Sequence, residues 1–222
     1  MLSITISDQI LEVCPEFRFA AILCEFKNSN YDADLWKEIE TYSKEFVSKY
    51  RMQDIKNRPA ILATRNTYKA LGKEPNRYRP SPEALSRRIV RGDALYQIDT
   101  AVDLINLISL QSGYSIGGFD ADRVKGNLTL GVGQENEKFE AIGRGQLNIA
   151  GLPVYRDDVG GIGTPTSDEE RTKITSETNK LLMIINGYSG EENLQETVDD
   201  SISMLKKYLH ATDIKVISNL ET

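Results

Sequence analysis

Several groups of glycine and aspartate residues in the second half of the chain could take part in binding or catalysis. They are Gly117-Gly118, Gly131-x-Gly133, Gly160-Gly161-x-Gly163, Asp120, Asp122, Asp157 and Asp158. None of the glycine groups forms a GxxxxGK[ST] loop, and no GxGxxG opens a helix, so a nucleotide-phosphate loop is not predicted. Backbone without Cβ atoms could instead approach a ligand closely, or simply turn. The aspartates could bind a cation through oxygen ligands, or could serve as turn and cap residues.

A ladder of threonines follows these groups. Thr172, Thr175 and Thr178 precede the apolar run Leu181–Ile185. The threonines could form the polar wall of a pocket, or only the turn that leads into a buried strand. Their residue type alone leaves both interpretations open.

The scarcity of histidine and cysteine limits the chemistry further. His210 is the only histidine, and Cys14 and Cys24 are the only cysteines. These numbers exclude multi-histidine zinc sites and argue against Ser-His-Asp and Cys-His catalysis. We therefore expect no metal and no cofactor, with His210 stabilising the end of a helix. Whether Cys14 and Cys24 pair stays open, although reduced thiols are the default in the cytoplasm.

Basic residues are concentrated in one stretch of a chain whose formal charge is −6. Between Lys49 and Arg91, twelve basic residues accompany three acids, so this segment carries +9 and the rest of the chain −15. An acidic body with one basic stretch is typical of contact with a polyanion, whereas the alternative is a set of solvated helix faces. The candidate RNA-binding residues are Arg65, Lys69, Arg77, Arg79, Arg87, Arg88 and Arg91.

Helices are predicted mainly in the first half of the chain and strands in the second. Apolar spacing and helix-start signals predict helices over 34–49, 59–71, 81–91, 98–111 and 194–209. Short apolar segments predict strands over 3–6, 18–26, 114–119, 127–132, 139–142, 153–156, 181–185 and 214–217. We expect one α+β domain over residues 1–222, with N-terminal helices and a β-rich half built on a mixed sheet.

The same apolar pattern bears on location. No apolar run approaches the roughly 20 residues that a membrane span needs. The N-terminus, MLSITISDQILEVCPEFRF, lacks the basic start and the long apolar core of a secretory signal. We therefore expect a soluble, cytoplasmic protein without a membrane partner.

Three segments resemble one known family. The segment Ala101–Val132, which contains Gly113-Tyr-Ser-Ile-Gly-Gly-Phe-Asp-Ala-Asp, is similar to the VVDxTNxVxxExGxPxHAFDxD pattern of the bacterial phenylalanyl-tRNA synthetase β subunit. Ile174–Ile184 resembles the VTxETxNVLLE run of the same tRNA-editing module. Tyr68–Arg88 resembles the hallmark of the freestanding, single-domain relatives. The resemblance covers about residues 15–217 and implies that the chain has the fold of this editing module.

The resemblance implies a freestanding aminoacyl-tRNA editing-like protein. Its partner would be the aminoacylated 3′ end of a tRNA, its activity would be hydrolysis of a mischarged ester, and the basic residues would contact phosphates. Such hydrolysis needs no histidine, because backbone amides, hydroxyls and the terminal ribose can orient water and stabilise the oxyanion. The alternative is a non-catalytic module that binds an RNA or a small amino-acid-like ligand. A purely structural protein would leave the basic stretch unexplained.

The resemblance also places a pocket in the chain. The implied pocket residues are Gly117, Gly118, Asn106, Asp120, Thr175, Thr178 and Ile184. Gly117 stands where the family has a histidine, and Ile184 stands where it has the glutamate that recognises the tyrosine hydroxyl. The family's Met-Gly-Gly segment is replaced by Thr166-Ser-Asp-Glu-Glu-Arg.

Ile184 leads to a prediction about the substrate. Strand alternation places Leu182 and Ile184 on one face and Leu181, Met183 and Ile185 on the other. If the face of Ile184 lines the pocket, a buried phenol hydroxyl has no partner, which costs about 1–3 kcal/mol. The preferred aminoacyl group is then apolar or small rather than tyrosine. The alternative is that Ile184 faces the core and says nothing about the substrate.

Overall fold

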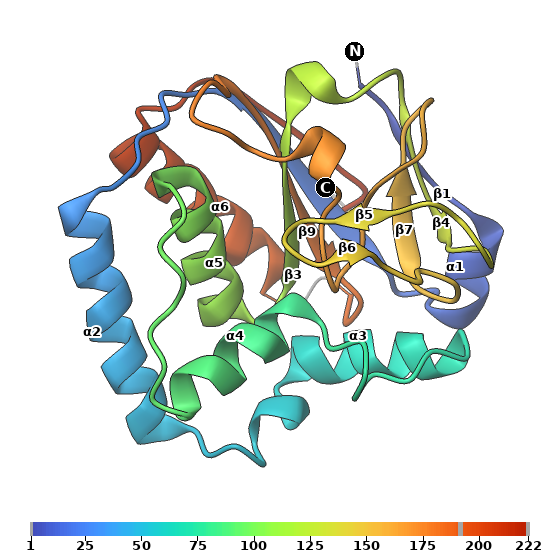
Figure 1. Ribbon diagram of the computed structural model, residues 1–222, viewed down its shortest axis with the longest axis horizontal. Helices are drawn as coiled ribbons and strands as arrows, with labels where there is room; N and C mark the ends of the chain where they lie inside the picture. The colour runs from blue at the N-terminus through green and yellow to red at the C-terminus, as the bar shows by residue number, and fades with distance from the viewer. Residues whose placement is uncertain (1, 191–192, 221–222) are drawn as a thin grey trace.

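The computed structural model describes residues 2–190 and 193–220, and its elements form a layer of helices and two packed sheets (Figure 1). The helices are α1 (Asp8–Val13), α2 (Ala33–Lys49), α3 (Pro59–Ala70), α4 (Ser81–Val90), α5 (Thr100–Ser112) and α6 (Leu194–Leu209). Short 3₁₀ turns are η1 (Ile55–Asn57), η2 (Ala121–Arg123) and η3 (Glu170–Thr172). The layers follow the general rule that amphipathic helices and sheets bury their apolar faces against each other.

The first sheet has the strand order β10-β2-β9-β3 and is antiparallel throughout. Its strands are β10 (Thr212–Ser218), β2 (Arg18–Glu25), β9 (Lys180–Gly187) and β3 (Ser115–Asp120). The helices α5 and α6 pack on one face of this sheet, with α2 and α4 farther out (Figure 1). Because β3 is the last strand in this order, one of its edges faces the loops that precede η3.

The second sheet has the order β1-β4-β7-β8 and packs on the other face of the first. Its strands are β1 (Ile4–Ile6), β4 (Leu128–Val132), β7 (Pro153–Arg156) and β8 (Gly161–Gly163). β1 and β4 are parallel, and the other neighbours are antiparallel. A two-stranded hairpin, β5 (Glu140–Ala141) and β6 (Gly145–Gln146), lies beside the sheets. The predicted α+β fold with a mixed sheet is therefore confirmed.

Strand alternation divides the buried side chains of β9 between two cores. Leu181, Met183 and Ile185 face the helices, where they pack with residues of α5 and α6. Leu182 and Ile184 face the second sheet and pack with Phe119 and Tyr155. The predicted orientation of the strand is thus correct, and β3 and β9 separate a helix-side space from an inter-sheet space.

Both ends of α5 are fixed by side chains from outside the helix. At its start, the Asp99 carboxylate accepts a hydrogen bond from the Val102 N–H (2.9 Å). At its end, the buried Arg58 guanidinium donates to the carbonyls of Leu110 (2.8 Å) and Gln111 (2.7 Å). Gly113 closes the helix with a φ of +82°, a conformation that favours glycine. Arg58 therefore satisfies carbonyls that a helix end leaves without partners.

Three details differ from the sequence prediction or complete it. The short helix α1 was not predicted, because six residues give too little periodicity for recognition. The predicted strand over 139–142 is reduced to the two residues of β5. Cys14 and Cys24 are both free and buried in different cores, and burial raises the pKa of each thiol to about 11.

The length and composition of each helix decide whether it could cross a membrane. Within residues 2–190 and 193–220, no helix combines the length and the apolar composition that crossing a membrane would require.

Candidate functional site

An open pocket of about 410 Å³ lies on the helix side of β3. Its walls come from α5, from β3, from the loop between β8 and η3, and from the first residue of α4, Ser81. Six aliphatic side chains form most of the surface: Ile98, Val102, Ile105, Ile116, Ile142 and Ile174. A mostly apolar hollow with a few polar groups is the usual form of a small-molecule site.

Asp168 is the acidic residue of this pocket. Its Oδ2 accepts one hydrogen bond, from the Gly118 N–H at 3.2 Å. Among the residues that the structure describes, no lysine or arginine forms an ion pair with it. Burial raises the pKa of the Asp168 carboxyl to about 7, and the hydrogen bond from Gly118 lowers it only in part. A carboxyl group with a shifted pKa in a pocket is a common feature of functional sites.

Two glycines make room for this carboxylate. A Cβ on Gly163 would lie 2.8 Å from Asp168 Oδ1 and 2.6 Å from the Phe119 ring. A Cβ on Gly117 would lie 3.4 Å from the same oxygen and 2.6 Å from the same ring. Any larger residue at these positions would therefore push on Phe119 and on the acid.

A second, small cavity of about 10 Å³ lies between the two sheets and is also lined by Asp168. Its lining includes Gly117, Ile184, Ser115 and Tyr188. The hydroxyls of Ser115 and Tyr188 are buried and make no hydrogen bond within the described residues. This volume is about that of one water molecule, and two hydroxyls and a carboxyl suit the polar partners that such a water needs.

The structure divides the predicted pocket residues into three groups. Asn106 and Gly118 line the open pocket, and the Asn106 amide makes no hydrogen bond with a described residue. Gly117 and Ile184 face the inter-sheet side instead, where Ile184 is fully buried. This placement favours the alternative that Ile184 belongs to the core. The Ile184 side chain does not line the open pocket, so its position gives no support to the prediction that it determines the preferred aminoacyl group.

The third group is Asp120, Thr175 and Thr178. The Thr178 hydroxyl donates to Asp120 Oδ2 (2.9 Å) and accepts from the Thr175 N–H (3.0 Å). None of the three lines the open pocket. Their hydrogen bonds join the turn before β9 to the end of β3, which corresponds to the strand-entry interpretation of the threonines.

Asp122 and Asp157 are also engaged within the protein, Asp122 by Lys180 at 3.2 Å. Asp157 accepts two hydrogen bonds from the Arg171 guanidinium, at 2.9 and 3.0 Å. Burial acts to raise the pKa of Asp157, but Arg171 and three backbone N–H groups hold it below its usual value. In the described part of the chain, no three His, Cys, Asp or Glu side chains are grouped as a metal site would require.

The candidate RNA-binding residues are not equally exposed. Arg65 is buried and donates to the fully buried Glu83 (2.7 Å), so its guanidinium cannot reach an external phosphate, and we remove it from the predicted set. Arg87 also binds Glu83, at 2.9 Å, while Arg79 lies 4.0 Å from it. Arg88 lies over the ring of Tyr96.

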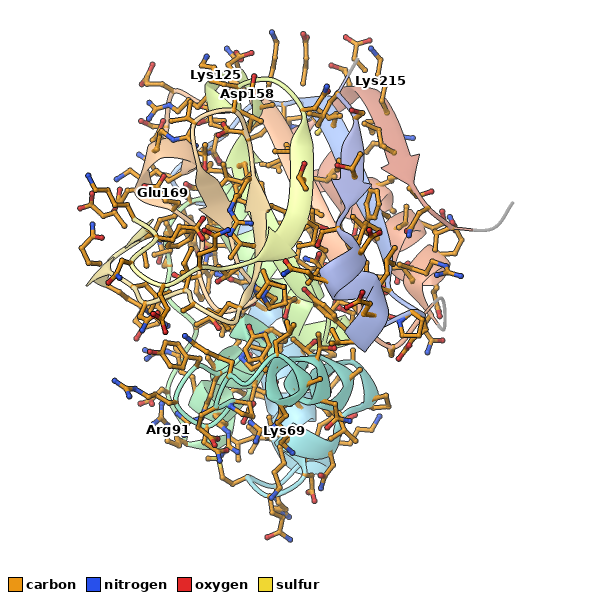
Figure 2. All side chains as sticks on the ribbon, turned by 90° about the vertical axis from the view of Figure 1, so that its right-hand side faces the viewer. Lys69, Arg91, Lys125, Asp158, Glu169 and Lys215 are labelled. Carbon is orange, nitrogen blue, oxygen red and sulfur yellow. The ribbon has the colours of Figure 1, made fainter. Side chains whose placement is uncertain are left out.

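The exposed members of the set are Lys69, Arg77, Arg79 and Arg91. Figure 2 shows Lys69 and Arg91 at the helical end of the molecule, far from Lys125, Asp158 and Lys215 at the opposite end. The basic surface, as we use the term, comprises Lys69, Arg77, Arg79, Arg87, Arg88 and Arg91 on α3, α4 and the loop between them. It adjoins the open pocket, because Ser81 at the start of α4 is one of the pocket's walls.

A family model described as the B3/4 domain matches residues 63–197. The chain belongs to the B3/4 domain family. The matched region of this B3/4 domain includes α4, α5, β3, β9 and the loop with Asp168. It therefore contains every residue that lines the open pocket.

The relatives of this B3/4 domain are much longer proteins. It is 31% identical over 125 residues to the phenylalanine–tRNA ligase β subunit of Rickettsia conorii, covering 55% of this chain and 14% of that protein. It is 32% identical over 102 residues to the same subunit of Bartonella henselae, covering 42% and 12%. The predicted resemblance is confirmed, and the chain spans only a small part of these relatives.

The fold of this B3/4 domain is similar to that of a solved structure. An N-terminal fragment of the phenylalanyl-tRNA synthetase β subunit from Pyrococcus horikoshii superposes with a TM-score of 0.52 and 12% identity. The match covers 99% of this chain and 55% of the fragment. At this identity the likeness shows the shared fold alone.

Asp168 is the residue that sequence reasoning missed. It lies in the segment Thr166–Arg171, where the chain departs from the family pattern, and no periodicity marks it. The available signal was an acid in the loop after a glycine-rich strand end, with no basic residue at a neighbouring position before Arg171.

Proposed function

We propose that this B3/4 domain binds the aminoacylated 3′ end of a tRNA and hydrolyses its ester. The observation on which the proposal rests is the open pocket, in which an unpaired carboxyl and a free amide lie among aliphatic walls beside a basic surface. The β subunits that resemble the chain are named as phenylalanine–tRNA ligase subunits, which supports a tRNA-related role.

The chemistry proposed for the pocket is direct attack by water. Water adds to the ester carbonyl, the bond between the carbonyl carbon and the ribose oxygen breaks, and the ribose oxygen takes the proton that water loses. The carbonyl oxygen becomes negative in the transition state, so a donor aimed at it accelerates the reaction. The Asn106 amide is free to donate in this way, since it makes no hydrogen bond with a described residue.

A deacylation screen tests this proposal. Purified protein is mixed with a panel of aminoacyl-tRNAs, and release of the amino acid is measured. We expect at least one ester to be hydrolysed, with the rate of Asn106→Ala reduced by about 10²–10³, the usual effect of losing one oxyanion donor. Asn30→Ala, which changes an exposed asparagine of the loop before α2, should leave the rate unchanged. Failure to hydrolyse any ester in the panel would exclude the deacylase function.

The basic surface gives a prediction about salt. Arg88→Ala combined with Arg91→Ala should weaken tRNA binding and reduce the slope of log affinity against log salt by about 2, because each lost phosphate contact reduces it by about 1. We leave Arg87 unchanged, because it binds Glu83 inside the protein. The matched control is Lys206→Ala with Lys215→Ala, which removes the same charge from α6 and β10. Equal slopes for the two double variants would mean that the basic surface does not bind RNA.

A non-catalytic function is the second candidate. One observation favours it: the pocket lining offers its serines no free nitrogen base. It contains no histidine or cysteine, and its lysine, Lys173, is engaged by Glu170 at 2.5 Å. The protein would then bind an aminoacyl group or a related small molecule without hydrolysis. The same screen separates the two candidates, since binding of an aminoacyl-tRNA without turnover indicates this one.

A further inference from the structure

We propose that the open pocket selects a primary ammonium next to an aliphatic side chain, and that Asp168 is the partner of that ammonium. The inference deepens the proposed function, because the aminoacyl group of a tRNA contains both features. A free amino-acid derivative contains them as well, and the experiment below distinguishes these two sources.

The first argument is that Asp168 lacks the cationic partner that Glu83 and Asp157 have. Glu83 is bound by Arg65 and Arg87, and Asp157 is bound by Arg171. Among the described residues, the Asp168 carboxylate has one hydrogen-bond partner, the Gly118 N–H. Buried carboxylates are normally paired, because an isolated charge loses its hydration without compensation. A cationic ligand would supply the missing partner.

The second argument is the position of the acid. Asp168 lines both the open pocket and the small cavity, so its carboxyl lies at the boundary between them, against β3. The basic side chain in the lining, Lys173, lies 2.5 Å from the Glu170 carboxylate and is therefore engaged elsewhere. A ligand bound to the acid would therefore also lie against the aliphatic side chains of the same pocket.

The third argument concerns the side chain of the ligand. The apolar part of the walls consists of isoleucine and valine side chains, and no aromatic residue lines the open pocket. The Asn106 amide, which makes no hydrogen bond with a described residue, can donate to the carbonyl of an amide or ester. An aliphatic body, an ammonium and a carbonyl together describe a leucine-, isoleucine- or valine-like aminoacyl group.

Leucinamide and 4-methylpentanamide form a matched pair of probes. They share the aliphatic chain and the amide, and only leucinamide has the amino group. Binding to ¹⁵N-labelled full-length protein is followed by NMR titration at pH 6.5, where the amine is charged. We expect leucinamide to bind at least tenfold more tightly than 4-methylpentanamide, with the largest shifts at the amides of Gly117, Gly118 and Asp168.

Two variants and a proton measurement make the test specific. Asp168→Asn should remove the preference for leucinamide, whereas Asp200→Asn, which changes an exposed aspartate of α6, should retain it. Because the free carboxyl is raised to a pKa of about 7, pairing with an ammonium lowers that pKa and releases a proton near neutral pH. Calorimetry of the unaltered protein in two buffers of different ionisation enthalpy measures this release without any substitution.

Equal affinity for the two probes, or an unchanged preference in Asp168→Asn, would overturn the inference. The tRNA arm compares hydrolysis of leucyl-tRNA with that of N-acetyl-leucyl-tRNA, whose amino group is blocked and uncharged. Hydrolysis that ignores both the acetyl group and Asp168→Asn contradicts this inference alone. A leucinamide preference that depends on Asp168, together with no hydrolysis of any aminoacyl-tRNA, contradicts the deacylase function alone.

Discussion

Replacing Asp168 with asparagine is expected to raise the free energy of unfolding at pH 8. The carboxyl has a pKa of about 7 in the folded protein and an ordinary value of 3.8, because burial disfavours its charged form. At pH values between these two pKa values, the folded state holds a proton that the unfolded state has lost, so the free energy of unfolding falls as the pH rises. Each pKa unit corresponds to about 1.4 kcal/mol, which gives an upper bound of roughly 4 kcal/mol.

The expected pH dependence makes this prediction distinctive. At pH 4, only slightly above the ordinary pKa of 3.8, the folded state keeps its proton and the unfolded state has lost only part of its own, so the variant and the unaltered protein should differ little. The difference should grow up to pH 7 and stay constant above it. Urea unfolding at pH 4, 6 and 8 measures it, with Asp200→Asn as the control for loss of an exposed aspartate. A destabilised Asp168→Asn at pH 8 would show that the carboxylate has a stabilising partner.

Glu83→Gln is expected to lower the free energy of unfolding by about 3–5 kcal/mol. The Glu83 side chain is fully buried and binds Arg65 at 2.7 Å and Arg87 at 2.9 Å. Loss of its charge leaves the Arg65 guanidinium buried without a counter-ion, and that uncompensated charge is the main cost. Glu83 belongs to α4 and Arg65 to α3, so the pair also fixes the relative position of these two helices.

The control for this prediction is Glu45→Gln, which alters an exposed glutamate of α2 and should change stability by about 0.5 kcal/mol or less. A double variant, Glu83→Gln with Arg65→Met, should recover much of the loss, because both charges are then removed. Urea unfolding measures all three variants. A double variant as unstable as Glu83→Gln would mean that packing, rather than the unpaired arginine, causes the loss.

Periodicity and caps were sufficient to predict most elements. The helix predicted over 98–111 corresponds to α5, which Gly113 closes, and the alternation of β9 predicted which of its side chains face each core. Local signals of this kind depend on neighbours in the sequence. Short elements depend instead on tertiary contacts. The prediction therefore made β5 too long and did not include α1.

The pocket was predictable only in part for the same reason. Asn106 and Gly118 were found through the resemblance, and both line the open pocket. The burial of Arg65 and the isolation of Asp168 result from contacts between distant segments, which residue counts and charge runs do not contain. A basic stretch read from sequence therefore overestimates the charge on the surface, because Arg58, Arg65 and Lys73 are buried within it.

The anchoring of α5 by Arg58 and Asp99 has a consequence for motion. Helix ends normally fray first, and the opening of terminal turns exposes their amides to hydrogen exchange. Here the carbonyls of Leu110 and Gln111 are held by a buried guanidinium, and the first turn is held by Asp99. The wall that presents Asn106 to the pocket should thus stay ordered before any ligand arrives. A ligand then loses little affinity to the ordering of this wall, and its rate of entry is not limited by folding of the helix.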